Sequence, residues 1–212
     1  MRPQTERLVE IESEDAKLQG MLGLPEGTNG VVLFAHGSGS GRFSPRNQFV
    51  ASILRERGFG TLLIDLLEER ESEDRDKVFD IDLLANRLMS ATEWLQLDDA
   101  TRELSIGYFG ASTGAAAALQ AAAKLGDDIA AIVSRGGRPD LAMDYLDQVT
   151  APTLLIVGGR DYPVIPLNQQ AYEKLKAPKE LVIVHGATHL FEEPGALEEV
   201  AKLAADWFDK YL

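Results

Sequence analysis

Ser112 has the local sequence of a reactive serine. It is the central residue of a Gly-x-Ser-x-Gly pentapeptide, residues 110–114, which follows a short apolar run and precedes an alanine-rich segment. A serine on a sharp turn between a strand and a helix needs small neighbours, because larger side chains would collide with both elements. The helix N-terminus favours developing negative charge there. This setting predicts a nucleophile; the alternative is a serine that only caps the helix.

A general base and an orienting carboxylate are needed as well, since a serine hydroxyl is a weak nucleophile by itself. Asp161 and His189 each follow a later apolar run, so that serine, aspartate and histidine occur in the order of the α/β hydrolases. The chain has 3 histidines, of which His189 is the predicted base. His185 is the rival base and is otherwise expected to be a packed or hydrogen-bonded neighbour. Asp65 is a weaker candidate for the carboxylate and is expected to make local hydrogen bonds.

A glycine-rich loop at residues 36–41, His-Gly-Ser-Gly-Ser-Gly, follows another apolar run. An amide of such a loop can bind the oxyanion of a tetrahedral intermediate together with the amide that follows the nucleophile. We therefore expect the N–H groups of Ser38 and Thr113 to form an oxyanion hole. The competing interpretation is a phosphate-binding loop for a nucleotide. Against it, Arg42 stands where a third glycine would be needed, and no Gly-x-x-x-x-Gly-Lys-Ser/Thr sequence occurs.

Arginines also follow the predicted strand ends, and Arg42, Arg135 and Arg138 are candidate substrate-binding residues. Arg46 lies in the same segment as Arg42. A guanidinium group can bind a carboxylate or a phosphate through two parallel hydrogen bonds. The alternative is that these side chains pair with carboxylates of the protein itself.

The elements that must position these residues alternate along the chain. Residues 6–24 alternate polar and apolar around a charged turn at 13–15, which is typical of an antiparallel hairpin. Short apolar runs then recur at residues 31–35, 61–67, 105–109, 129–134, 153–157 and 181–184. Such runs suit strands that are buried on both faces of a parallel sheet. The pattern predicts an α/β fold with a doubly wound, mostly parallel sheet and an N-terminal antiparallel hairpin.

Helices are expected between the apolar runs. Apolar residues recur with a period of about 3.6 over residues 81–95 and 197–211. A third helix is predicted from a Ser-Pro start at residue 44 to a glycine at residue 58. Residues 135–152 are too few for a cap domain, so the site should be open to solvent and suit small, water-soluble substrates. The charge run at residues 68–77 is expected to be a solvated loop.

Composition narrows the class of protein. The chain has 212 residues, 45% of them hydrophobic, and residues 1–212 are expected to form one domain. There is no cysteine, which excludes disulfides and a thiol nucleophile. The net charge of −13 opposes binding to nucleic acid or anionic membranes. No run approaches the roughly 18 apolar residues of a membrane span. We expect a cytoplasmic protein, a monomer or small homo-oligomer, without metal or cofactor.

The chain resembles the α/β-hydrolase superfamily and, within it, the dienelactone hydrolase-like proteins. The motifs that carry the resemblance are residues 36–39, 107–114, 158–161 and 186–191, which span most of the chain. The resemblance implies hydrolysis of an ester, thioester or lactone through an acyl-enzyme, with no metal. Dienelactone hydrolases use a cysteine nucleophile where this chain has Ser112. That departure concerns the lactone substrate and leaves acyl transfer in place.

The leading hypothesis is a serine hydrolase acting on a small acyl substrate. Ser112 attacks the carbonyl carbon, His189 transfers the proton, and Asp161 orients the histidine. A second hypothesis is an engineered or non-turnover scaffold whose serine reacts with activated acyl or phosphonate groups but hydrolyses slowly. A third is nucleotide binding at residues 37–41.

Overall fold

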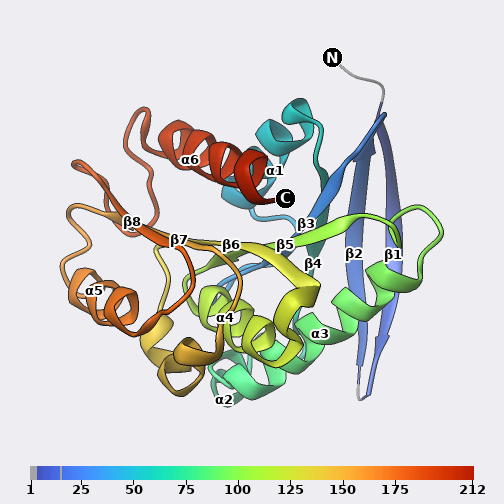
Figure 1. The fold of residues 1–212 in the computed structure, drawn as a ribbon. Coiled ribbons are helices and arrows are strands. Elements are labelled where there is room, and N and C mark those ends of the chain that lie inside the picture. Colours follow the sequence, from blue (N-terminus) through green and yellow to red (C-terminus); the bar gives the residue numbers. More distant parts are fainter. Residues whose placement is uncertain (1–3, 15) are drawn as a thin grey trace.

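The structure, a computed structural model, describes residues 4–14 and 16–212 (Figure 1). The strands are β1 (Gln4–Ser13), β2 (Ala16–Pro25), β3 (Gly30–Ala35), β4 (Gly60–Ile64), β5 (Ser105–Ala111), β6 (Ile129–Arg135), β7 (Thr153–Gly158) and β8 (Lys179–Val184). The helices are α1 (Pro45–Arg57), α2 (Arg75–Val78), α3 (Ile81–Leu97), α4 (Thr113–Leu125), α5 (Ile165–Lys174) and α6 (Ala196–Tyr211). Two 3-10 segments are η1 (Gly126–Asp128) and η2 (Pro139–Gln148).

One 8-stranded sheet runs through the molecule in the order β1-β2-β4-β3-β5-β6-β7-β8. Strands β3 to β8 are parallel to one another, whereas β2 pairs antiparallel with both β1 and β4. This confirms the predicted α/β hydrolase fold, including the hairpin. Of the expected turn at residues 13–15, Asp15 lies outside the described residues. Only η2 occupies the interval between β6 and β7, where a cap domain would stand.

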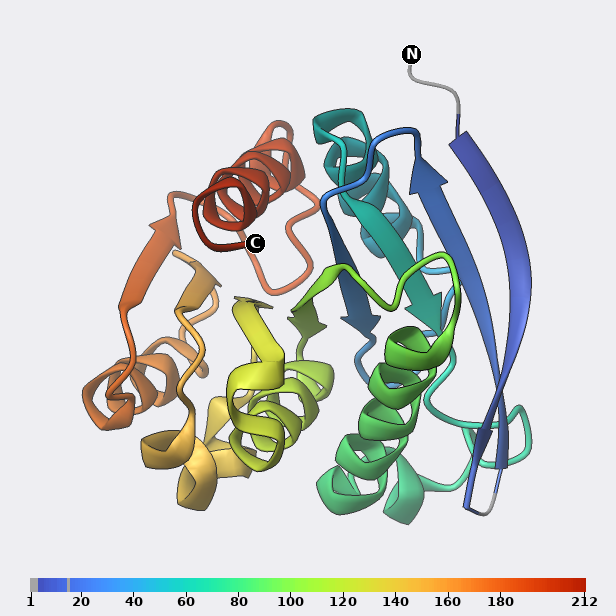
Figure 2. The ribbon, with the colours of Figure 1, turned by 45° about the vertical axis from the view of Figure 1, so that its right-hand side comes forward.

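Helices cover both faces of the sheet. Helices α1 and α6 lie on one face, and α3, α4 and α5 lie on the other (Figures 1 and 2). Neighbouring residues of a buried strand point to opposite faces. Leu33 and Tyr108 accordingly belong to the core cluster beneath α3 and α4, and Phe34 and Phe109 to the cluster beneath α1 and α6. Near-continuous apolar runs in the strands are what this two-sided burial requires.

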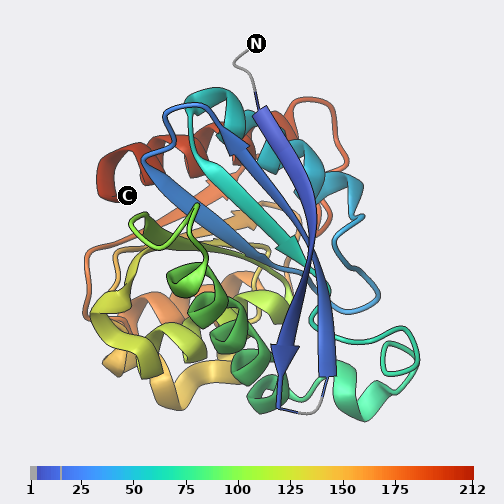
Figure 3. The ribbon, with the colours of Figure 1, turned by 90° about the vertical axis from the view of Figure 1, so that its right-hand side faces the viewer.

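The hairpin widens the sheet beyond its parallel part. Strand β2 pairs with β4 only over residues 20–23, so the rest of the hairpin extends past β4 (Figure 3). Val9, Ile11 and Leu18 of this hairpin are buried in the same core cluster as α3. The alternation of polar and apolar residues in the hairpin therefore reflects one face that packs on the core and one face that is exposed to solvent.

Strand β8 differs from the expectation that every apolar run is buried on both faces. It is the edge strand of the sheet, with β7 as its only strand neighbour among the described residues. Leu181 and Val182 are half-buried and Ile183 is 43% exposed. An apolar run alone does not reveal whether a second strand will cover its outer side.

The charge run at residues 68–77 was expected to be a solvated loop, and this is wrong in one respect. The Glu71 side chain is 12% exposed and accepts hydrogen bonds of 2.6 and 3.0 Å from the buried Arg87 of α3. These bonds, together with one from Lys77, hold the pKa of Glu71 at about 2, although burial opposes them. Arg87 also donates to the Leu66 carbonyl at 2.9 Å. The run is thereby anchored to α3.

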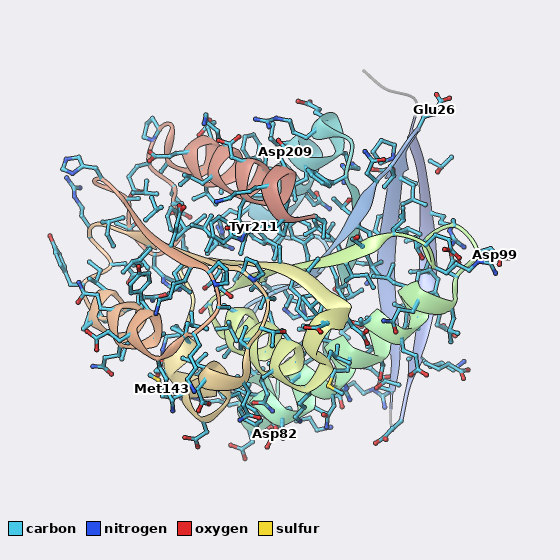
Figure 4. All side chains as sticks on the ribbon, viewed as in Figure 1. Glu26, Asp82, Asp99, Met143, Asp209 and Tyr211 are labelled. Carbon is cyan, nitrogen blue, oxygen red and sulfur yellow. The ribbon has the colours of Figure 1, made fainter. Side chains whose placement is uncertain are left out.

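Acidic side chains are spread over the surface. Glu26, Asp82, Asp99 and Asp209 lie on widely separated parts of the molecule (Figure 4). The net charge of −13 is therefore not confined to one face. In the described part of the chain, no helix is both long enough and apolar enough to cross a membrane. Among the same residues, no group of three or more His, Asp or Glu side chains is placed to hold a metal ion.

Candidate active site

Ser112 stands on a strained turn between β5 and α4. Its φ is 52° and its ψ is −120°, a conformation that costs a non-glycine residue roughly 1–3 kcal/mol. A Cβ at Gly110 would lie 2.5 Å from the Ala115 Cα, and one at Gly114 would lie 2.2 Å from the Ala35 carbonyl oxygen. Neither position has room for a side chain. The predicted need for glycine on both sides of the serine is confirmed.

The neighbouring strand holds this turn in place. The Ser112 N–H donates to the Arg135 carbonyl at 3.2 Å, and the Ser112 carbonyl accepts from the Arg138 N–H at 3.0 Å. The strained conformation is thus fixed by the end of β6 and the loop after it. The serine is partly exposed, and its hydroxyl makes no hydrogen bond to any described residue. That hydroxyl is therefore free to meet a ligand.

His189 and Asp161 form a hydrogen-bonded pair. The His189 Nδ1 and an Asp161 carboxylate oxygen are 2.6 Å apart. Asp161 is 7% exposed, whereas the His189 side chain is 38% exposed. With Nδ1–H donating to the carboxylate, Nε2 is left as an acceptor that can take a proton from a third group.

The loops that carry this pair are joined by backbone contacts. The Gly159 N–H donates to the Val184 carbonyl at 2.8 Å, and the Arg160 N–H donates to the Ala187 carbonyl at 2.9 Å. A Cβ at Gly158 would lie 2.5 Å from the same Ala187 oxygen, so a larger residue would push the loops apart. These contacts fix the aspartate loop against the histidine loop.

Glu193 closes the histidine loop, and no sequence motif predicts this role. Its carboxylate accepts from the Thr188 N–H at 3.1 Å and from the Thr188 hydroxyl at 2.6 Å. The bond from the Thr188 hydroxyl lowers the pKa of Glu193 below its usual value. Phe191, inside this loop, has a φ of 54° and is buried. Nothing in the spacing of Thr188 and Glu193 marks them as partners, because the contact depends on the loop conformation.

The histidine loop also lies against the segment that holds the serine. A Cβ at Gly136 would be 3.5 Å from the His189 Cε1 and 3.2 Å from the His189 carbonyl oxygen. Gly136 directly follows Arg135, whose carbonyl binds the Ser112 N–H. The segment at Arg135 and Gly136 therefore contacts both the serine turn and the histidine loop, and no hydrogen bond joins the Ser112 and His189 side chains among the described residues. His185 is exposed and makes no side-chain hydrogen bond among the described residues, so its expected role as a packed neighbour is wrong.

Ser38 and Thr113 line one small pocket. A Cβ at Gly37 would lie 3.0 Å from the Ser112 Cβ, so the glycine-rich loop backs directly onto the serine. Among the described residues, neither the Ser38 N–H nor the Thr113 N–H donates to another group. Both amides are available for a ligand oxygen. The apolar side of the pocket is formed by Leu67, Val78 and Leu84.

His36 fixes the glycine-rich loop. Its Nε2 accepts from the Leu66 N–H and its Nδ1 donates to the Gly37 carbonyl, both at 2.9 Å. The residue is 6% exposed. Burial lowers the pKa of the His36 ring, and the Gly37 bond and the charge of Asp65 oppose this only in part. The ring is therefore neutral at neutral pH and ties the loop to the end of β4.

The candidate arginines differ in their partners. Arg42 is paired with Asp65 through its guanidinium, and its N–H donates to the same carboxylate at 2.6 Å. Asp65 thus makes the local contacts expected of it. Arg138 makes two hydrogen bonds of 2.9 Å to Asp140. Arg135 is 6% exposed and has no acidic partner among the described residues. Of the candidate substrate-binding arginines, Arg42 and Arg138 are already engaged by carboxylates.

The strand order, the strained serine turn after β5 and the loops after β7 and β8 define an α/β hydrolase. Residues 18–212 match the sequence pattern of the dienelactone hydrolase family. The chain belongs to the dienelactone hydrolase family.

Relatives of high identity include one solved structure. The dienelactone hydrolase from Anabaena variabilis is 55% identical, with a TM-score of 0.95 over 99% of both chains. Mycobacterium tuberculosis proteins from strains CDC 1551 and H37Rv, named as candidate phosphoribosyl transferases, are 54% identical over 210 residues. That match covers 99% of this chain but 47% of theirs. The chain therefore spans about half the length of these curated relatives.

More distant solved structures share the fold. Est1E from Butyrivibrio proteoclasticus is 17% identical, with a TM-score of 0.83 over 96% of this chain and 98% of its own. The Pyrococcus furiosus esterase Pf2001 is 21% identical, with a TM-score of 0.82 over 98% of this chain and 93% of its own. At such identities the similarity concerns the architecture alone.

Proposed function

We propose that this chain is a serine hydrolase that cleaves a carboxylic ester, thioester or lactone of a small soluble substrate. The reaction passes through an acyl-enzyme on Ser112. The observation that carries the proposal is the serine on its strained turn, with φ of 52°, beside a histidine that is 2.6 Å from a buried aspartate. A strained residue at a functional site persists only where the surroundings hold it, and here β6 does so.

The chemistry follows from the positions of these groups. The Ser112 Oγ attacks the acyl carbonyl while the His189 Nε2 takes its proton and later returns it to the leaving group. Asp161 orients the ring and stabilises the imidazolium. The free N–H groups of Ser38 and Thr113 bind the oxyanion. Water then releases the acyl group by the same steps. The hydrogen bond between serine and histidine forms when substrate binds, as catalytic hydrogen bonds commonly do.

The names of the relatives bear on this proposal in different ways. The Anabaena variabilis relative is named a dienelactone hydrolase, which supports acyl hydrolysis. The Mycobacterium tuberculosis relatives are named for phosphoribosyl transfer, but the match covers 47% of their length. The residues gathered in this chain suit attack on an acyl carbonyl, and we assign hydrolysis to it on that ground.

The substrate is proposed to be a small molecule. The pocket beside Ser38 and Thr113 is small, with about 10 Å³ of free volume, and is lined by the glycine-rich loop together with Leu67, Val78 and Leu84. The net charge of −13 disfavours polyanionic partners such as nucleic acid. We place the reaction in the cytoplasm, with the chain acting as a monomer or small homo-oligomer and without metal or cofactor.

A fluorophosphonate probe and a p-nitrophenyl acetate time course test the proposal together. The probe labels the wild-type chain, and the ester is hydrolysed at a steady rate. Ser112→Ala loses both activities, whereas His185→Asn, an exchange of the exposed histidine, keeps both. Labelling and a burst without steady turnover would support the scaffold alternative and contradict the proposal. Equal labelling of Ser112→Ala would remove Ser112 as the nucleophile.

A further inference from the structure

Arg135 is a buried cation without a counterion. It ends β6 and is 6% exposed. Its Nη2 donates to the Asn47 amide oxygen at 3.3 Å, its guanidinium lies 6.0 Å from the centre of the Phe191 ring, and its Nε has no partner. No carboxylate of the described residues forms an ion pair with it. Burying a charge in this way is costly unless a partner of opposite charge is supplied.

Arg46 brings a second positive charge to the same place. It precedes Asn47 in the first turn of α1, and its Nε is also buried without a partner. Its ion pair with Glu192 is long, at 3.6 Å, and the Glu192 side chain is 66% exposed. Burial and the charge of Arg46 lower the pKa of Arg135 to about 10, so the Arg135 side chain is still charged at neutral pH. The one carboxylate near the two guanidinium groups in the described part of the chain is therefore the exposed Glu192, and it pairs with Arg46 alone.

The arginine pair lies beside the proposed reaction site. The Arg135 carbonyl accepts from the Ser112 N–H at 3.2 Å. The next residue, Gly136, lies against the ring of His189. Phe191, which the guanidinium faces, follows His189 by two positions in the same loop. A group held by the pair would thus be part of a substrate bound at Ser112.

A shortage of acidic residues does not explain the arrangement. The chain has 34 Asp and Glu residues against 21 Lys and Arg, and they are widely spread (Figure 4). The nearby Arg42 and Arg138 each have a carboxylate partner. Among the described residues, Arg135 has no such partner, and Arg46 has only the long ion pair with the exposed Glu192.

We propose that Arg135 and Arg46 form a subsite for a phosphate group carried by the substrate of Ser112. A phosphate monoester has a charge of about −1.5 to −2 and three acceptor oxygens, which suit two guanidinium groups and their unpaired Nε–H donors. A carboxylate has one charge and two oxygens. The Arg46 side chain is 31% exposed, so the subsite is open to solvent on that side. The inference rests on the proposed hydrolase function, because that function defines which bond of the substrate is cleaved at Ser112.

The first experiment measures binding without catalysis. In a Ser112→Ala background, inorganic phosphate is titrated by calorimetry and in thermal unfolding. Saturable binding that raises the Tm is expected, with affinity reduced about tenfold or more by Arg135→Met or Arg46→Gln. Arg102→Gln is the matched control, because Arg102 is an exposed arginine at the other end of β5. A weak effect that is equal in all variants means an adventitious ion only and overturns the subsite.

The second experiment compares p-nitrophenyl esters whose acyl chains end in phosphate, carboxylate or methyl. The wild type is expected to favour the phosphate ester at least tenfold in kcat/KM over both others. Arg135→Met brings the ratio of phosphate to methyl ester close to one. Arg46→Gln tests the same ratio should the Arg135 variant fail to fold. Hydrolysis without preference, or with preference for the carboxylate, overturns the phosphate subsite and leaves the proposed function standing. Hydrolysis of none of the esters contradicts the proposed function, and the binding experiment then decides the subsite.

Discussion

Ser112 links backbone strain to chemistry at the scale of a single residue. Its left-handed φ is imposed by a turn that has no space for side chains at Gly110 and Gly114. Among the described residues, the same turn leaves the hydroxyl without a partner, beside a Thr113 amide that also has none. The strain is therefore the cost of presenting the proposed nucleophile.

Replacing the serine separates these two effects. Ser112→Gly and Ser112→Ala both remove the hydroxyl, but only glycine adopts φ of 52° and ψ of −120° without strain. We expect Ser112→Gly to be more stable than Ser112→Ala by about 1 kcal/mol. Urea unfolding of the two variants measures the difference. An alanine variant that equals or exceeds the glycine variant in stability would show that the turn is not strained.

Asp161 allows a second test at this scale. Asp161→Asn keeps the shape of the side chain but removes the charge that holds Nδ1–H of His189 at 2.6 Å. A drop of about 10⁴ in kcat is expected, as for a histidine held in the wrong tautomer. Ester hydrolysis at saturating substrate is the measurement. A loss smaller than tenfold would mean that this carboxylate does not orient the base.

The candidate nucleophile and general base were the easiest residues to predict from the sequence. A chain with 3 histidines and no cysteine leaves few choices for base and nucleophile, and the spacing of glycines around Ser112 is distinctive. Glu193 and the unpaired state of Arg135 could not be predicted. Both depend on which side chains meet across loops, and local sequence patterns do not encode that.

At the scale of elements, the glycine-rich loop depends on a histidine at its start. His36 connects Gly37 to the Leu66 N–H at the end of β4. The Leu66 carbonyl accepts a hydrogen bond from Arg87, which also donates to Glu71. The loop that supplies the Ser38 amide is therefore continuous with a buried polar network.

The buried neutral ring of His36 makes stability depend on pH. Its pKa is lowered in the folded state, so the unfolded chain binds more protons below about pH 6.5, the usual value for histidine. The contribution of the neutral ring is present above that pH and is lost as the pH falls toward the folded pKa. We expect the free energy of unfolding to fall more steeply between pH 6.5 and 5 for the wild type than for His36→Asn. Parallel curves would show that His36 does not titrate on unfolding.

Most elements could be predicted because their apolar runs are buried on both faces. The exceptions have physical causes. Strand β8 lies at an edge, so half of its run is not covered. The segment at residues 68–77 has the composition of a solvated loop, but the ion pair of Glu71 with Arg87 anchors it. A tertiary contact of that kind overrides local composition.

At the scale of the whole molecule, the absence of a cap between β6 and β7 leaves the site open. The segment there is the 3-10 element η2, Pro139–Gln148. An open site with a small pocket gives a long acyl chain little apolar surface to bury. We expect p-nitrophenyl acetate and butyrate to be hydrolysed at least tenfold more efficiently than the palmitate ester, compared by kcat/KM in detergent-free buffer below the micelle concentration. Comparable efficiencies would contradict this expectation.

Trapping of the acyl-enzyme shows directly whether Ser112 carries the acyl group. The chain is mixed rapidly with p-nitrophenyl acetate, quenched in acid and digested, and the acetylated peptide is sequenced by mass spectrometry. We expect a single acetyl group on Ser112, formed at the rate of the p-nitrophenol burst and absent from Ser112→Ala. An acetyl group on another residue that forms and decays at the turnover rate, or undiminished hydrolysis by Ser112→Ala, would contradict it.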